Sequence, residues 1–187
     1  MQEASHGRAP AVATGIKRVH PDNIVFTYQG DGDLASIGMA ETIHCANRGE
    51  NITVIFLNNT VYGMTQGQMA PTTLVGQKTT TTPRGRDTEN EGPPIQMCEL
   101  LEGLDRTRLI ARCTVTSTRR VKETKRTLRK AFQYQLDGVG FSFIEILSPC
   151  PTYWRLSPSE CGKHIEDVMT ETFPLGVIKD TGEDPGE

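Results

Sequence analysis

The sequence predicts an α/β fold in which a parallel sheet carries helices on both faces. Four short apolar runs, rich in β-branched and aromatic residues, alternate with helix-like segments; they span residues 24–28, 52–57, 109–115 and 141–147. The first run leads directly into the glycine pair Gly30 and Gly32, which allows a tight turn and close approach of a ligand. A length of 187 residues suits one domain, covering residues 1–187, with a sizeable core.

The first half of the chain predicts one strand–helix–strand unit after an initial helix. The alanine-rich segment 9–18 predicts that helix, and Ile24–Tyr28 predicts a buried strand. Apolar residues then recur every three positions from Leu34 to Ile43, which predicts a helix ending at Gly49 as a left-handed cap. Ile52–Leu57 predicts the second strand, parallel to the first because the crossover is helical.

The second half has a long segment without periodicity, followed by clearer elements. Residues 60–94 are rich in Thr, Gly and Pro, so this segment is either a floppy surface tract or a functional loop. Further along we expect a short helix over 94–101 with Pro94 in its first turn, a basic helix over 118–136, and a last helix from Ser157 or Ser159 to Phe173. Residues 180–187 are acidic with Gly and Pro, and we expect them to form a mobile tail.

Two oxygen-bearing side chains follow neighbouring strands. Asp31 and Asn59 lie just past the ends of the first two predicted strands, where ligands of parallel sheets bind. Their oxygens suit Mg²⁺, and the free amide groups at the start of the following helix attract anions. The pattern therefore predicts a divalent cation holding a phosphate group. We expect the Asp33 side chain to cap that helix.

Two other interpretations compete with the cation site. Gly30-x-Gly32-x-x-Ala35 also fits a loose dinucleotide fingerprint, but that site needs an acidic residue after the next strand, where this chain has Asn58-Asn59. Alternatively, each polar residue alone is an ordinary turn former. The two residues together, with Tyr62-Gly63-Met64 beyond them, favour the cation site.

Several short motifs, in order, resemble the β subunit of 2-oxoacid:ferredoxin oxidoreductases. They are Gly30-Asp31-Gly32-Asp33, Asn58-Asn59, Tyr62-Gly63-Met64-Thr65 and Ser148-Pro149-Cys150-Pro151. The resemblance implies a thiamine diphosphate-binding fold with Mg²⁺ held by Asp31, Asn59 and the Val61 carbonyl. It places the cofactor's diphosphate against His6, Gly30, Gly32, Asp33, Gly63 and Met64, and the substrate against Gln66 and Gln68.

The resemblance also implies an activity and partners. The family decarboxylates a 2-oxoacid oxidatively, here preferably 2-oxoglutarate or else a branched-chain 2-oxoacid, gives acyl-coenzyme A, and passes electrons through a [4Fe–4S] cluster to ferredoxin. The carboxylate that activates the cofactor comes from an α subunit, so we expect no catalytic base in this chain.

Cys150 matches one cluster ligand of the family, but the family's upstream Cys-x-x-Cys segment has no counterpart here. Because one thiolate cannot hold four irons, we expect either a truncated chain or ligands from a neighbouring chain. A non-catalytic assembly module and a non-oxidative thiamine lyase are the alternatives.

Composition narrows the classes of partner. A net charge of −3 gives no electrostatic basis for binding nucleic acid or an anionic membrane. The sequence has no apolar run near 18 residues and no signal-peptide pattern at Met1–His6, so we expect a cytoplasmic protein. The five cysteines include no Cys-x-x-Cys pair, which argues against zinc or a complete cluster site.

Overall fold

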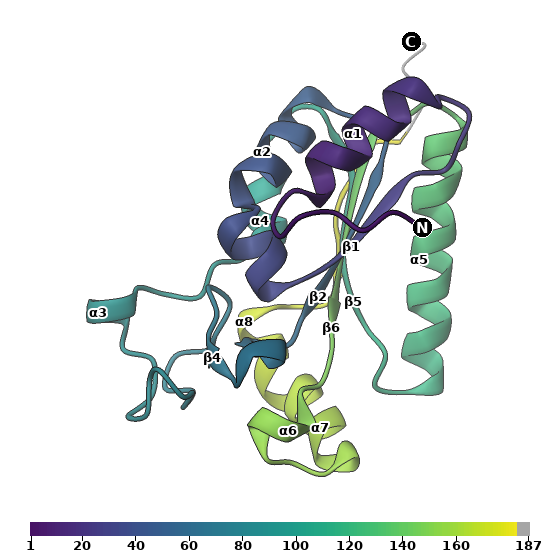
Figure 1. The fold of residues 1–187 in the computed structure, drawn as a ribbon. Coiled ribbons are helices and arrows are strands. Elements are labelled where there is room, and N and C mark those ends of the chain that lie inside the picture. The colour runs from purple at the N-terminus through teal and green to yellow at the C-terminus, as the bar shows by residue number, and fades with distance from the viewer. Residues whose placement is uncertain (183–187) are drawn as a thin grey trace.

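A five-stranded sheet runs through the middle of the computed structural model, which describes residues 1–182 (Figure 1). The strand order is β1-β2-β6-β5-β7, and their bounds are β1 Phe26–Gly30, β2 Thr53–Asn58, β5 Thr107–Thr114, β6 Phe141–Leu147 and β7 Gly176–Asp180. The first four strands are mutually parallel, and β7 pairs antiparallel with β5. The predicted parallel α/β sheet is therefore confirmed, with one reversed edge strand added.

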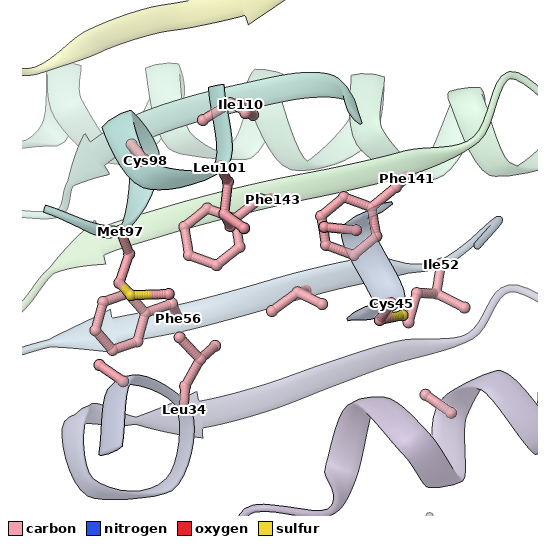
Figure 2. Packing of buried hydrophobic residues seen from close by; sticks show 14 of the residues in the cluster. Leu34, Cys45, Ile52, Phe56, Met97, Cys98, Leu101, Ile110, Phe141 and Phe143 are labelled. Atoms are coloured by element: carbon pink, nitrogen blue, oxygen red, sulfur yellow. The ribbon is translucent and has the colours of Figure 1, made fainter. Parts of the chain in front are cut away.

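Helices cover both faces of the sheet, as predicted. One face carries α1 (Ala9–Val19), α2 (Met39–Arg48) and α4 (Met97–Glu102), and the other carries α5 (Thr118–Leu136) (Figure 1). Figure 2 shows the larger core, where side chains of the first helix group meet those of the central strands. Its fully buried residues include Leu34, Cys45, Ile52, Phe56, Met97, Leu101, Ile110, Phe141 and Phe143.

The join between the first strand and α2 is tighter than the sequence suggests. A π-helical turn, η1 (Asp33–Ile37), precedes α2, and Gly38 separates the two. A Cβ on Gly38 would lie 2.3 Å from the Asp33 carbonyl oxygen and 2.7 Å from that of Gly7, so only glycine fits this junction. The close approach brings the segment before α1 onto the start of η1. Gly49 ends α2 with φ 66°, the predicted left-handed cap.

The remaining elements gather beyond the carboxyl ends of the parallel strands (Figure 1). They are the hairpin β3 (Val61–Tyr62) and β4 (Gln68–Met69) with the 3₁₀ turn η2 (Gly63–Thr65) between them, α3 (Thr88–Glu91), α6 (Pro151–Trp154), α7 (Pro158–His164), the π turn η3 (Ile165–Met169) and α8 (Thr170–Thr172). These elements surround the sheet edge at which the sequence predicts the site.

The long segment 60–94 is an ordered loop in the structure, held by one buried arginine. The Arg86 side chain is 4% exposed and donates only to backbone carbonyls, those of Ala70, Pro71, Thr73, Glu91, Gly92 and Pro93. These carbonyls belong to two stretches of the loop, residues 70–73 and 91–93. One guanidinium therefore ties these two stretches together.

Some expected boundaries differ from the observed ones. The first strand, expected over 24–28, is Phe26–Gly30, and Pro94 lies before α4, whose N-cap is Gln96. The last predicted helix begins at the Ser157 cap as expected and continues through the π turn η3 to Thr172, with Phe173 as its C-cap. Asp180 belongs to β7 and accepts a hydrogen bond from the Tyr134 hydroxyl, so the expected tail does not start there; its residues 183–187 lie outside the described residues.

Candidate functional site

The structure brings Asp31 and Asn59 together at the carboxyl ends of β1 and β2. These strands are hydrogen-bonded neighbours, with Gly30 level with Leu57. The Asn59 backbone nitrogen donates to Asp31 Oδ2 at 3.2 Å. The two predicted cation ligands therefore meet at one edge of the sheet.

Three oxygens converge at this point. The Asn59 side-chain oxygen faces Asp31 Oδ2 and the Val61 carbonyl oxygen, and each pair is 2.7 Å apart. Turning the Asn59 side-chain amide over makes both contacts hydrogen bonds, and in the present orientation Asn59 Oδ1 also accepts from the Val61 backbone N–H at 3.3 Å. The orientation with oxygen inward suits a cation, because neighbouring ligands of Mg²⁺ at roughly 2.1 Å from the ion lie about 3 Å from one another.

The burial of Asp31 supports the same conclusion. Its side chain is 3% exposed and Oδ1 has no hydrogen-bond partner. Burial raises the pKa of Asp31 well above its usual range, while the Asn59 amide and the Thr72 hydroxyl act in the opposite direction. A divalent cation would stabilise the ionised carboxylate here. Among residues 1–182 no group of three His, Cys, Asp or Glu could hold a metal, so this oxygen set depends on an amide and a backbone carbonyl.

Asp33 has a different role from the one expected. It does not cap the helix; its Oδ1 accepts from the Gly7 amide at 2.7 Å and lies 2.7 Å from His6 Nδ1. Its Oδ2 accepts from Gln29 Nε2 at 2.5 Å. The carboxylate thus fixes the orientation of the imidazole. His6 Nε2 lies toward Gly32, 3.9 Å from the position of a Cβ there, so His6 and Gly32 share one wall of the site.

The predicted substrate-facing residues Gln66 and Gln68 lie on the β3–β4 hairpin, which also carries the predicted cofactor contacts Gly63 and Met64. Met64 is 98% exposed, and Gln66 is exposed with φ 86°. Gln68 is half-buried and accepts from the Thr65 hydroxyl at 2.8 Å. Gly63 lies beside the Asn59 side chain, 3.5 Å from its Nδ2 when measured from a Cβ position. The hairpin therefore adjoins the oxygen cluster through Val61 and Gly63.

Cys150 lies beside the same hairpin. Its side chain is 8% exposed, and its Sγ is 3.5 Å from the Cβ position of Gly63. Each of the five cysteines is a free thiol in the structure. The position is compatible with a cluster ligand near the cofactor, and that role stays a prediction.

A buried ion pair next to the site escaped the sequence analysis. Arg112 and Glu145 are level with one another on β5 and β6, both are fully buried, and Arg112 Nε donates to Glu145 Oε2 at 2.8 Å. Asn58 Nδ2 donates to the other oxygen, Glu145 Oε1, at 2.7 Å. The sequence did contain a signal for this pair, since Arg112 and Glu145 each lie within a predicted apolar strand. A charge buried in a strand requires a partner, so the two residues could have been matched.

The comparisons with known proteins identify the family. The family described as "Thiamine pyrophosphate enzyme, C-terminal TPP binding domain" matches residues 2–146. This chain belongs to the thiamine pyrophosphate enzymes. The match spans both strand ends that carry the oxygen cluster, which agrees with a site for a phosphate-bearing cofactor at this edge.

Relatives confirm the resemblance to 2-oxoacid:ferredoxin oxidoreductases. The chain is 49% identical over 178 residues to ketoisovalerate oxidoreductase subunit VorA of Methanothermobacter thermautotrophicus, covering 95% of this chain and 37% of that protein. It is 43% identical over 150 residues to 2-oxoglutarate synthase subunit KorB of Methanocaldococcus jannaschii, covering 80% and 51%. The chain thus spans about a third to a half of these relatives' length.

A solved structure gives the same result. The 2-oxoglutarate:ferredoxin oxidoreductase from Magnetococcus marinus, with 2-oxoglutarate, coenzyme A and succinyl-CoA bound, matches with a TM-score of 0.75 and 26% identity, covering 96% of this chain and 64% of that one. In the described part of this chain, no helix combines the length and apolarity needed to cross a membrane.

Proposed function

We propose that this chain is the cofactor-binding part of a 2-oxoacid:ferredoxin oxidoreductase that binds thiamine diphosphate and Mg²⁺. The observation that carries the proposal is the convergence of three oxygens, from Asp31, Asn59 and Val61, at neighbouring strand ends. The family match and the relatives support the cofactor and the reaction class.

The residues divide into a cation set and a diphosphate set. Asp31, Asn59 and the Val61 carbonyl hold Mg²⁺, and the backbone amides of Gly32 and Asp33 face the diphosphate. Gly30 leaves the approach open, because no atom lies within 4 Å of its Cβ position.

His6, Gly63 and Met64 complete the contacts with the diphosphate. His6 is held by the Asp33 carboxylate through Nδ1, which directs Nε2 toward Gly32 at the site. When bound, thiamine diphosphate supplies the carbanion chemistry that decarboxylates a 2-oxoacid.

The rest of the reaction requires partners. We assign the activating carboxylate to an α subunit, the acyl acceptor to coenzyme A, and the electron acceptor to ferredoxin. Cys150 contributes one thiolate to a [4Fe–4S] cluster whose other ligands come from outside residues 1–182. The coenzyme A in the Magnetococcus marinus structure and the names of the relatives support this assembly.

The substrate we infer is a branched-chain 2-oxoacid, although the sequence patterns favour 2-oxoglutarate. Identity is higher, and extends over more of the chain, for the ketoisovalerate enzyme than for the 2-oxoglutarate enzyme. In addition, the hairpin presents the neutral side chains Gln66 and Gln68, whereas a second carboxylate binds best to a cation.

The test uses the complete complex purified with its partner subunits. Calorimetry should show thiamine diphosphate binding that requires Mg²⁺, and Asp31→Asn should abolish it, whereas the control Asp105→Asn, at an exposed position, should not. Binding without any Mg²⁺ dependence would refute the cation site.

Turnover then separates the alternatives. Coenzyme A-dependent viologen reduction with 2-ketoisovalerate, faster than with 2-oxoglutarate, supports the proposed reaction and substrate. Binding without reduction of any acceptor supports an assembly module. Decarboxylation by an iron-free complex supports a non-oxidative lyase.

A further inference from the structure

Thr60, which stands between two of the proposed cation ligands, has an unusual backbone conformation. Its φ is 63°, in the left-handed region that β-branched residues rarely adopt. This turn places the Asn59 side chain and the Val61 carbonyl on the same side of the chain, where their oxygens lie 2.7 Å apart.

Several buried contacts hold Thr60 in this conformation. Its amide nitrogen donates to Asn58 Oδ1 at 3.1 Å, and its carbonyl oxygen accepts from the Thr73 hydroxyl at 2.5 Å. Its hydroxyl donates to the Asn59 carbonyl at 2.7 Å and accepts from Gln77 Nε2 at 2.9 Å. Thr60 and Asn58 are both fully buried, so water cannot substitute for these partners.

The orientation of the Asn58 amide is set from the centre of the sheet. Its Nδ2 donates to Glu145 Oε1 at 2.7 Å, and the other Glu145 oxygen accepts from Arg112 Nε at 2.8 Å. A carboxylate accepts only, so Asn58 must present nitrogen to Glu145 and oxygen to the Thr60 amide. In the reverse orientation, the Asn58 oxygen would face the Glu145 carboxylate and the Asn58 nitrogen would face the Thr60 amide, and neither pair could form a hydrogen bond.

We propose that Asn58, oriented by the buried Glu145, is a positioning residue that keeps Thr60 left-handed and so preorganises the cation site. The inference rests on the function proposed above. It assigns a role to two residues that make no contact with the cofactor, and it explains why an ion pair lies next to the cation site. Strained backbone of this kind persists where surrounding contacts determine it.

A double-mutant cycle on the complete complex tests the proposal, with Mg²⁺ titrated calorimetrically in the presence of thiamine diphosphate. Asn58→Ala should weaken Mg²⁺ binding about 10- to 100-fold, the range for residues that orient metal ligands. In a Thr60→Gly background the same substitution should cost less than about threefold, because glycine adopts positive φ without help.

A second route avoids the cavity that alanine leaves. Glu145→Gln keeps the shape, but its oxygen is needed by Arg112, so its amide group faces Asn58 and turns that side chain around. The loss of Mg²⁺ affinity should again be large with Thr60 and small in the Thr60→Gly background. Asn51→Ala is the matched control, since Asn51 donates to the Gln135 carbonyl at the opposite end of the sheet.

The outcomes separate the two levels of inference. If Asn58→Ala and Glu145→Gln each weaken Mg²⁺ binding equally in both backgrounds, or in neither, the positioning role is overturned while the cation site stands. If the unsubstituted complex binds thiamine diphosphate without Mg²⁺ dependence, the proposed function itself fails. Circular dichroism of each variant identifies any loss that comes from unfolding.

Discussion

Asp31→Asn should have opposite effects on the cofactor-free and the loaded protein. Without a cation, the Asp31 carboxylate is buried, Oδ1 lacks a hydrogen-bond partner, and Oδ2 accepts only from the Asn59 backbone amide among the described residues. Leaving a buried polar group unsatisfied costs about 1–3 kcal/mol. An asparagine at this position carries no charge and can donate to the Asn59 oxygen, so the variant without cofactor should be more stable by about that amount.

The expected change is large enough to measure by thermal unfolding. For a domain of this size each kcal/mol shifts Tm by roughly 2–4 °C, so cofactor-free Asp31→Asn should melt about 2–12 °C higher. With Mg²⁺ and thiamine diphosphate at about 100 times Kd, the unsubstituted protein gains about 2.7 kcal/mol from binding, and the variant gains nothing. Loading with Mg²⁺ and thiamine diphosphate should therefore reduce the difference between the two melting temperatures or reverse its sign.

The pH dependence gives a second check on the same residue. The folded-state pKa of Asp31 is raised above the usual value of 3.8, so the folded state binds the proton more tightly than the unfolded state does. The destabilisation is therefore absent below about pH 3.8 and grows as the pH rises toward the folded-state pKa. The advantage of the cofactor-free variant should shrink as the pH falls from 7 toward 4, whereas Mg²⁺ affinity of the unsubstituted protein should rise with pH.

One result would refute this reasoning. If cofactor-free Asp31→Asn is less stable than the unsubstituted protein at pH 7, the carboxylate is already satisfied and the oxygen cluster is not a cation site. The control Asp105→Asn, at an exposed position, should change Tm by less than a degree or so in either state.

Three further predictions concern the scaffold. Arg86→Lys removes most of the donors to the loop carbonyls, so hydrogen exchange within residues 70–93 should accelerate at least tenfold while the sheet amides are unchanged. Gly38→Ala should lower the free energy of unfolding in urea by about 1–3 kcal/mol because its Cβ meets two backbone oxygens. Gly15→Ala, in open space on α1, should raise it by about 0.5–1 kcal/mol. Equal effects of the two substitutions would contradict the packing argument. Arg112→Met should destabilise by about 3–5 kcal/mol because it leaves Glu145 buried without a counter-charge and also removes the pair with Glu99. Adding Glu145→Leu should recover part of the loss, and additive losses would show that Arg112 and Glu145 are not coupled.

The sequence predicted the sheet and the meeting of Asp31 and Asn59 because both follow from local patterns. Buried parallel strands read as continuous apolar runs, and a βαβ unit places their carboxyl ends side by side. The basic helix was predicted with its observed bounds, Thr118–Leu136, since its apolar stripe is long and regular.

What the sequence did not reveal depends on contacts between distant residues. The side chain of Asp33 is engaged by His6 and Gly7, 26 or more positions away, so no local rule could exclude a capping role. Strand β7 is short, antiparallel and mostly exposed, and thus lacks a buried run. The left-handed Thr60 is visible only when Asn58 and its partners are placed in three dimensions.

The spacing of the sheet has a consequence for how this protein could change its specificity. The proposed ligands Asp31 and Asn59 follow hydrogen-bonded strands, whose separation of about 4.8 Å is a constant of β-structure. Gln66 and Gln68, by contrast, lie on the two-stranded β3–β4 hairpin. Under the function proposed here, substitutions in that hairpin could change which 2-oxoacid the protein accepts. Asp31 and Asn59, which hold the cofactor's cation, would stay the same.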